Sequence, residues 1–230
     1  MVLDIINSLK ENYKKLIVTP GYGEIYKWES LKVFQERWNI DEPDFLTMYD
    51  ESLQNSDSAN LWASKFFYPK ETMLLFIKSD PERVREMFRS LFNEEENIEK
   101  RIDKFTYDCD VFLKELQIDN NKLQHHFHDG FRMISVYLCF RYPMKYTIYK
   151  YTEFKEFMEA VRAKTIPGTN EIDRFFKVMR TLYKILSDDK ELMKTHKSLI
   201  SDPMYYQGDT LLLAQDFYWC VSRYELYKKV

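Results

Sequence analysis

The sequence predicts an all-α protein. Apolar residues recur every three or four positions along almost every segment, which is the spacing of one helix face. The chain has only five glycines in 230 residues, whereas β-sandwiches and phosphate-binding α/β folds use more glycine in their turns. Only the segment 144–151, MKYTIYKY, has strand-like composition, and it is predicted to be a short strand or an extended crossing. We therefore expect a single domain over 1–230 with eight to eleven helices and at most a small extended segment near 145–150.

The first third of the chain is predicted to form four helices, of which the first is amphipathic and the last is short and apolar. The segment 18–24, VTPGYGE, ends the first helix, and a polar stretch over 54–64 is predicted to be a loop. The helices are predicted over 2–17, 28–39, 43–53 and 70–78.

The strongest helix signals lie in the middle of the chain. Asp80 is a predicted N-cap, and Pro81 is a predicted first helical residue, before an apolar face that runs to Phe92. A heptad seam follows over 98–116 and suits an antiparallel helical partner inside the domain. If the seam is exposed instead, it is expected to dock a partner helix.

A buried helix is predicted at the centre of the domain. The segment 123–141 is apolar nearly all round from Phe131 onward, and Pro143 ends it, so the central helix is expected over 126–141. The loop 164–170, KTIPGTN, is the candidate boundary inside the chain. The remaining helices are predicted over 152–163, 172–186, 188–200 and 210–227.

The amino-acid composition excludes several classes of protein. The 34 basic and 37 acidic residues give a net charge of −3, so there is no global basic field for nucleic acid or an anionic membrane. The three cysteines have no zinc-type spacing and fit a reducing cytoplasm. No apolar run reaches the 18 residues of a membrane span, and the N-terminus lacks the pattern of a signal peptide.

No catalytic motif is present. The sequence contains no GxxxxGK[ST] phosphate loop and no GxSxG elbow. The Asp/Glu-x-Lys tripeptide of many nucleases is absent from the thirty residues after Asp44, and Glu153-Phe154-Lys155 is interpreted as a chance match at the start of a helix. We therefore expect no enzyme activity and no cofactor.

Two polar clusters are interpreted as structural. In HHFHD (125–129), His125 shares a helix face with His128 or Asp129, which gives too few ligands, so no metal site is predicted and the cluster is expected to be a polar first helical turn. Arg85 and Arg89 lie four apart and alternate with Glu82 and Glu86, which is typical of ion pairs on a solvated helix face. They are retained as secondary candidates for phosphate binding.

The segment 141–151, RYPMKYTIYKY, is the main candidate for nucleic-acid binding. It combines cations, which bind phosphate, with tyrosine rings, which can stack on bases, and it contains no acid. The alternative is that the tyrosines pack in the core. The candidate residues are Arg141, Tyr142, Lys145, Tyr146, Tyr149, Lys150 and Tyr151.

Four phrases carry a family resemblance. They are IYKWESLKVFQERWNIDEPDF (25–45), FFYPKETMLLFIKSDPERVREMFRSLFNEE (66–95), HDGFRMISVYLCFRYPMKYTIYKYTEFKEF (128–157) and LLLAQDFYWCVSR (211–223). Their order resembles the region before the AAA+ motor in McrB-like proteins, the NTPase subunits of modification-dependent restriction systems. The resemblance covers about residues 25–223, and no base-binding residue of the family carries over individually.

The resemblance implies a non-catalytic N-terminal module of a prokaryotic anti-phage restriction system. Its expected partners are DNA, modified or unmodified, an AAA+ motor domain in cis and a nuclease subunit in trans. The alternative is a protein-interaction module that docks the motor or another partner and never contacts DNA. The overall charge and the acidic stretch 93–99 favour that alternative.

Overall fold

The computed structural model describes residues 2–54, 57–62, 65–119 and 123–229. These residues form helices and connecting loops with no β-strand, so the all-α prediction is confirmed. The α-helices are α1 (Leu3–Ile17), α2 (Tyr26–Arg37), α3 (Phe45–Ser52), α4 (Ala59–Trp62), α5 (Pro69–Ser79), α6 (Pro81–Leu91), α7 (Ile98–Asp119), α8 (Phe131–Arg141), α9 (Tyr151–Ala160), α10 (Ile172–Ser187), α11 (Lys190–Leu199) and α12 (Leu212–Arg223); a short 3₁₀ helix, η1 (Leu226–Lys229), follows. The twelve α-helices of the described residues exceed the expected range by one, because the short α4 lies where a loop was expected.

The chain divides into two compact units. Unit 1 comprises residues 1–29 and 142–230, and unit 2 comprises residues 30–141. The loop 164–170 lies within unit 1.

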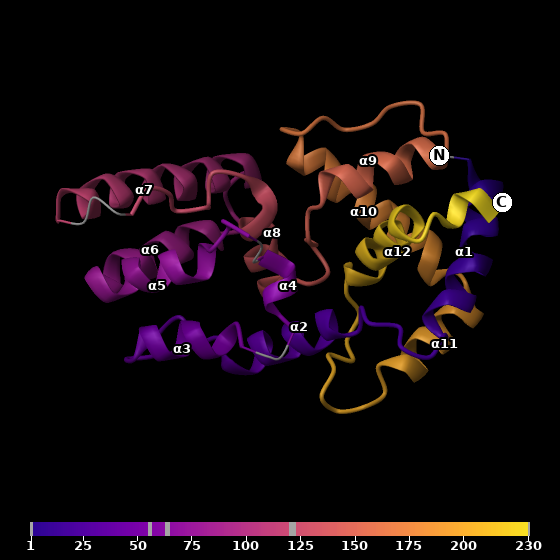
Figure 1. The fold of residues 1–230 in the computed structure, drawn as a ribbon, viewed down its shortest axis with the longest axis horizontal. Coiled ribbons are helices and arrows are strands. Elements are labelled where there is room, and N and C mark those ends of the chain that lie inside the picture. The colour runs from indigo at the N-terminus through magenta and orange to yellow at the C-terminus, as the bar shows by residue number, and fades with distance from the viewer. Residues whose placement is uncertain (1, 55–56, 63–64, 120–122, 230) are drawn as a thin grey trace. The chain divides into compact units, whose positions relative to one another are not determined.

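Unit 2 has an aromatic core. Helices α6 and α7 pack together as a hairpin, with α5 beside α6 (Figure 1). The seam of α7 is buried in this packing, as predicted for an internal partner, and it is not available as a docking face. Phe88 of α6 is fully buried, and its ring contacts those of Tyr137, Trp38 and Phe105 at centroid distances of 5.0–5.3 Å.

The start of the central helix differs from the prediction. Helix α8 is buried as expected over most of its length, but it begins at Phe131 and not near residue 126. Phe127 has a φ of +64°, in the left-handed region that interrupts an α-helix. The HHFHD residues therefore lie in an irregular loop, and the helix-face argument applied to them was wrong.

Unit 1 is organised around α12. This helix packs against α9 and α10, while α1 contacts α11, α12 and η1 (Figure 1). The segment 142–150 begins with a turn, in which the Tyr142 carbonyl accepts hydrogen bonds from the N–H groups of Lys145 and Tyr146. Residues 146–150 then continue without helix or strand, which matches the predicted extended crossing over that part.

Helix starts follow the sequence signals. The Asp80 carboxylate accepts a hydrogen bond from the Arg83 N–H, and Pro81 follows it as the first helical residue, as predicted. Asp44 and Asp189 cap α3 and α11 in the same way. Among the described residues, no helix has both the length and the apolar character needed to cross a bilayer.

Candidate nucleic-acid interface

The predicted segment is fixed to its surroundings through its backbone. The Pro143 carbonyl accepts a hydrogen bond from the Leu211 N–H at 2.8 Å, just before α12. Further along, the Tyr218 hydroxyl donates to the Ile148 carbonyl at 3.1 Å. Because Leu211 and Tyr218 hold the crossing at two points, the backbone between them is fixed.

Two of the four tyrosine rings of the segment pack inward. Tyr146 is buried and meets the ring of Phe176 at 4.9 Å. The half-buried Tyr149 packs on Phe175 at 4.9 Å and donates its hydroxyl hydrogen bond to the Thr169 carbonyl. Burial raises the pKa of Tyr149 to about 12. These two rings are therefore part of the core contact with α10.

The other two tyrosines are half-buried. Tyr142 lies at the start of the crossing, with the Lys145 ammonium 5.6 Å from the centroid of its ring. Tyr151 is the first residue of α9, and its ring lies 6.1 Å from that of Tyr149. Tyr142 is thus the ring of the segment that lies beside an exposed cation.

The three cations of the segment occupy different environments. Lys145 is exposed, whereas Lys150 is half-buried at the N-cap of α9. Arg141 is exposed at the end of α8 and belongs to unit 2. The structure therefore places Lys145 and Lys150 in one unit and leaves Arg141 in the other.

Helix α10 adds cations that the sequence analysis did not single out. Arg174, Lys177, Arg180 and Lys184 are spaced by three, three and four residues, so they follow one face of the helix. The Arg180 guanidinium donates to the Lys145 carbonyl at 2.9 Å, which connects this row to the crossing. The spacing alone, in a stretch without acids over 174–187, could have revealed the row.

We call Lys145 and the four α10 residues the cationic face. Arg174 pairs with Glu171 at 2.5 Å, and Lys177 pairs with Asp173 at 2.6 Å. The five cations and these two acids leave a formal charge of +3. Such a cluster raises the local potential even in a chain that is acidic overall.

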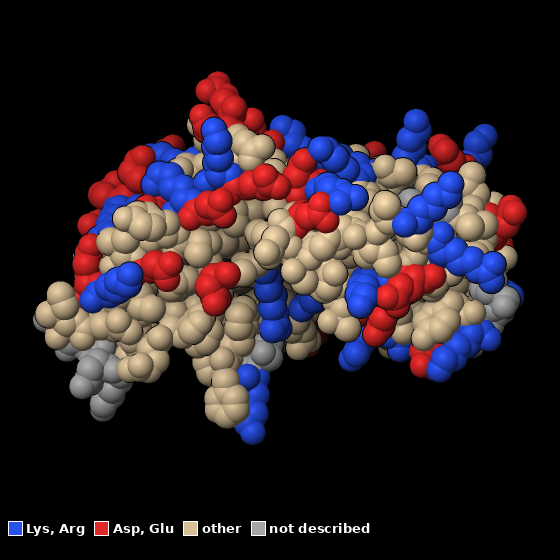
Figure 2. All heavy atoms as spheres, turned by 90° about the horizontal axis from the view of Figure 1, so that it is seen from above, with Lys and Arg blue, Asp and Glu red and all other residues tan. Residues whose placement is uncertain are grey.

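Charge is distributed unequally between the two units. Unit 1 has 19 basic and 16 acidic residues, a formal charge of +3, whereas unit 2 has 15 and 21, a formal charge of −6. Figure 2 shows acidic and basic side chains interspersed over the face drawn there. The cationic face is therefore a local feature of unit 1.

The secondary candidates are held by other contacts. Arg85 is only 5% exposed, which corrects the expectation of a solvated position, and its guanidinium donates to the carbonyls of Ile40 and Glu42. Arg89 pairs with Asp41 at 2.7 Å and with Glu86. Both arginines therefore fix the loop before α3, and Arg85 has no surface to offer to phosphate.

Cys109, His126 and His128 form a buried group whose potential ligand atoms all lie within 4.8 Å of one another. Each ring nitrogen of the two histidines already has a hydrogen-bond partner. His126 Nδ1 accepts from the His128 backbone N–H, so its Nε2 carries the proton that faces Asp110 at 3.0 Å. A ring in this tautomer cannot ligate through Nε2 without losing that proton, so the geometry favours a structural hydrogen-bond relay.

The relay continues into the core of unit 2. His128 Nδ1 donates to the His126 carbonyl at 2.6 Å, which leaves Nε2 to accept from the Tyr137 hydroxyl at 3.1 Å. Tyr137 in turn shares a 2.6 Å hydrogen bond with Tyr49. Burial lowers the pKa of His128 to about 3, so the ring is neutral near pH 7.

Unit 1 encloses an ion pair that the sequence analysis missed. Asp216 on α12 is 1% exposed and accepts hydrogen bonds from Lys27, at 2.8 Å, and from Tyr13, at 2.6 Å, as well as from Tyr22. Burial disfavours the Lys27 ammonium, but the carboxylates of Asp216 and Glu24 outweigh it and hold the pKa of Lys27 above its usual value. The charged pair is therefore retained in the interior, where it connects α12 to the N-terminal segment.

Comparison with known proteins gives no further assignment. No family model matches the chain, and neither a curated protein nor a solved structure shows significant similarity to it.

Proposed function

We propose that this chain is a DNA-binding module without catalytic activity of its own. The resemblance to McrB-like N-terminal regions suggests that the DNA is a target of a prokaryotic restriction system. The observation that supports DNA binding best is the cationic face of unit 1, in which Arg180 connects the row on α10 to the crossing that carries Lys145.

The dimensions of this face suit a nucleic-acid backbone. Lys184 lies ten positions after Arg174, which corresponds to about 15 Å along a helix. Duplex DNA presents one phosphate charge per roughly 1.7 Å of its axis, so a face of this length meets several phosphates. Phosphate contacts of this kind give affinity without sequence preference.

The burial of the other polar groups supports a non-catalytic role. Lys27, Asp216 and Cys220 have the chemical types of an active site, but all three are at most 3% exposed. Burial also raises the pKa of the Cys220 thiol well above its usual value, which opposes formation of the reactive thiolate. A substrate would have no access to this cluster without unfolding part of unit 1.

The proposal is tested by fluorescence anisotropy with a labelled duplex, modified and unmodified, at low and physiological salt. We expect binding that weakens steeply as salt rises, because phosphate neutralisation releases counterions. The Lys145→Ala, Lys150→Ala variant should bind more weakly to both duplexes. Absence of binding by the parent protein at low salt would contradict the proposal.

A protein-interaction module is the competing proposal, and the charge of −6 on unit 2 favours it. A surface of that sign would recruit a basic partner and repel nucleic acid. Under this alternative, the parent would bind neither duplex at any salt concentration.

A further inference from the structure

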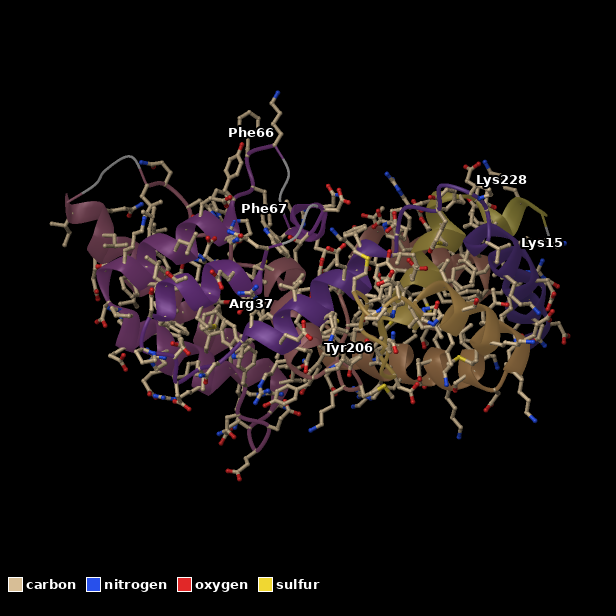
Figure 3. The ribbon with its side chains drawn as sticks, turned by 90° about the horizontal axis from the view of Figure 1, so that it is seen from below. Lys15, Arg37, Phe66, Phe67, Tyr206 and Lys228 are labelled. Atoms are coloured by element: carbon tan, nitrogen blue, oxygen red, sulfur yellow. The ribbon has the colours of Figure 1, made fainter. Side chains whose placement is uncertain are left out.

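An exposed aromatic cluster projects from unit 2. Phe66 is 73% exposed and Tyr68 is 46% exposed, in the turn that precedes α5. Figure 3 shows Phe66 standing clear of the ribbon at the tip of this loop. We call Phe66, Phe67, Tyr68 and Phe127 the aromatic knuckle.

The base of the knuckle is packed. The ring of Phe67 lies 5.5 Å from that of Phe127, and the Arg132 guanidinium lies 4.5 Å from the Phe67 centroid. Tyr68 also meets Phe127, at 6.3 Å. The exposed Phe66 therefore lies next to residues whose rings are packed against one another.

The backbone of the knuckle is strained at two aromatic residues. Phe66 has a φ of +67° and Phe127 a φ of +64°, although bulky side chains rarely adopt the left-handed region. Such strain tends to occur at ligand-binding sites, where the surrounding structure maintains it. Here the strain accompanies exposure of an apolar ring, so two unfavourable features coincide at Phe66.

The chemistry around Phe66 indicates its ligand. The Lys65 ammonium lies 5.1 Å from the Phe66 centroid, so a π face and a cation are offered together. An unpaired nucleotide matches both, because its base stacks on the ring and its phosphate faces the ammonium. The charge of −6 on unit 2 opposes anionic membranes and nucleic acid alike, so the affinity for a nucleotide has to come from stacking on Phe66 and from the local contact with Lys65.

We propose that the aromatic knuckle stacks an unpaired base of single-stranded nucleic acid, with Phe66 as the stacking ring and Lys65 on the adjacent phosphate. This inference rests on the proposed function, because unit 2 is acidic and would bind nucleic acid only if another part of the same chain bound it as well.

The test measures binding of a labelled oligothymidine and of a duplex of the same length. Phe66→Ala should weaken oligothymidine binding by about five-fold to over one hundred-fold, the range that stacking of one base supplies, with the salt slope unchanged. Phe66→Trp should retain affinity, and its indole fluorescence should be quenched when oligothymidine binds. Tyr107→Ala, which removes an aromatic ring that is 66% exposed on α7, is the matched control and should bind like the parent.

The outcomes separate the two proposals. If the parent binds duplex with steep salt dependence but Phe66→Ala binds oligothymidine like the parent, the stacking site is wrong and the proposed function stands. If the parent binds neither probe, both are wrong. If Phe66→Ala loses binding only to anionic phospholipid vesicles, the knuckle is a membrane contact and the stacking proposal is overturned. Circular dichroism melts check that each variant is folded.

Discussion

Unit 1 encloses a complete ion pair, Lys27 with Asp216, whereas the centre of unit 2 consists of aromatic rings and a relay of neutral hydrogen-bonded groups. Burial costs an ion pair the hydration free energy of both charges. Their mutual attraction and their hydrogen bonds offset that cost only while both partners are present. A neutral relay loses less when one member is removed. The two units should therefore differ in which substitutions they tolerate, although both are helical.

The units also differ at their surfaces. Unit 1 carries a formal charge of +3 and the cationic face, and unit 2 carries −6 and the aromatic knuckle. The contacts with duplex phosphates are therefore assigned to unit 1, and the contact with one unpaired base and its adjacent phosphate is assigned to unit 2.

The largest expected effect is loss of the buried carboxylate in unit 1. Asp216→Ala leaves the Lys27 ammonium buried beside Glu24 alone and should lower the free energy of unfolding by about 3–5 kcal/mol. Urea unfolding followed by circular dichroism measures this loss. Asp50→Ala breaks the more exposed Lys70–Asp50 pair of unit 2 and should cost less than about 1 kcal/mol. Equal losses in the two variants would contradict the comparison.

A smaller effect is expected from acid in unit 2. The pKa of His128 is lowered by burial to about 3, against about 6.5 in an unfolded chain. Between these values the unfolded state binds a proton that the folded state does not, so the stability present above pH 6.5 is lost as the pH falls towards 3. From pH 7 to pH 5, protonation of this group in the unfolded state should lower the free energy of unfolding by about 2 kcal/mol.

His128→Gln isolates this contribution. The variant should be less stable than the parent at pH 7 because it disturbs the bond to Tyr137, yet it should lose about 2 kcal/mol less between pH 7 and pH 5. Urea midpoints at the two pH values measure the difference. Parallel losses in parent and variant would show that His128 titrates normally in the folded protein.

The smallest stability effect is expected from the end of the relay. Tyr49→Phe removes one hydroxyl and keeps the ring, and Tyr137 retains its bond to His128. The loss should be about 0.5–1.5 kcal/mol, the net value of a single neutral hydrogen bond. A thermal melt resolves this change, and a loss as large as that of Asp216→Ala would mean that the relay is as sensitive as the ion pair.

Local sequence signals predicted most of the helices. The apolar spacing over 172–186 and the Asp80 cap correspond closely to α10 and to the start of α6. The start of α8 was misplaced because Phe127 adopts a left-handed backbone, which its residue type does not indicate. The grouping of residues 1–29 with 142–230 depends on contacts between distant segments, and hydrophobic periodicity carries no information about them.

The candidate site could be predicted only in part. The sequence indicated a basic and aromatic segment, but tertiary contacts with α10 determine that Tyr146 is buried and that Lys145 is exposed. Lys27 and Asp216 are 189 residues apart, so no local pattern relates them. The row on α10 was readable from its spacing, and its connection to Lys145 required the structure.

The central claim is that the cationic face of unit 1 contacts DNA, and matched charge removal tests it most directly. One variant carries Lys145→Gln, Lys177→Gln and Lys184→Gln in unit 1, and the other carries Lys78→Gln, Lys100→Gln and Lys114→Gln in unit 2; all six lysines are exposed. Both variants lose the same charge, so a general electrostatic effect would change them equally. We expect the unit 1 variant to reduce the slope of log affinity against log salt by about 2–3, at roughly 0.9 for each lost phosphate contact, and the unit 2 variant to keep the parent slope. Equal slopes in all three proteins, with both variants folded, would contradict the assignment of phosphate contacts to the cationic face.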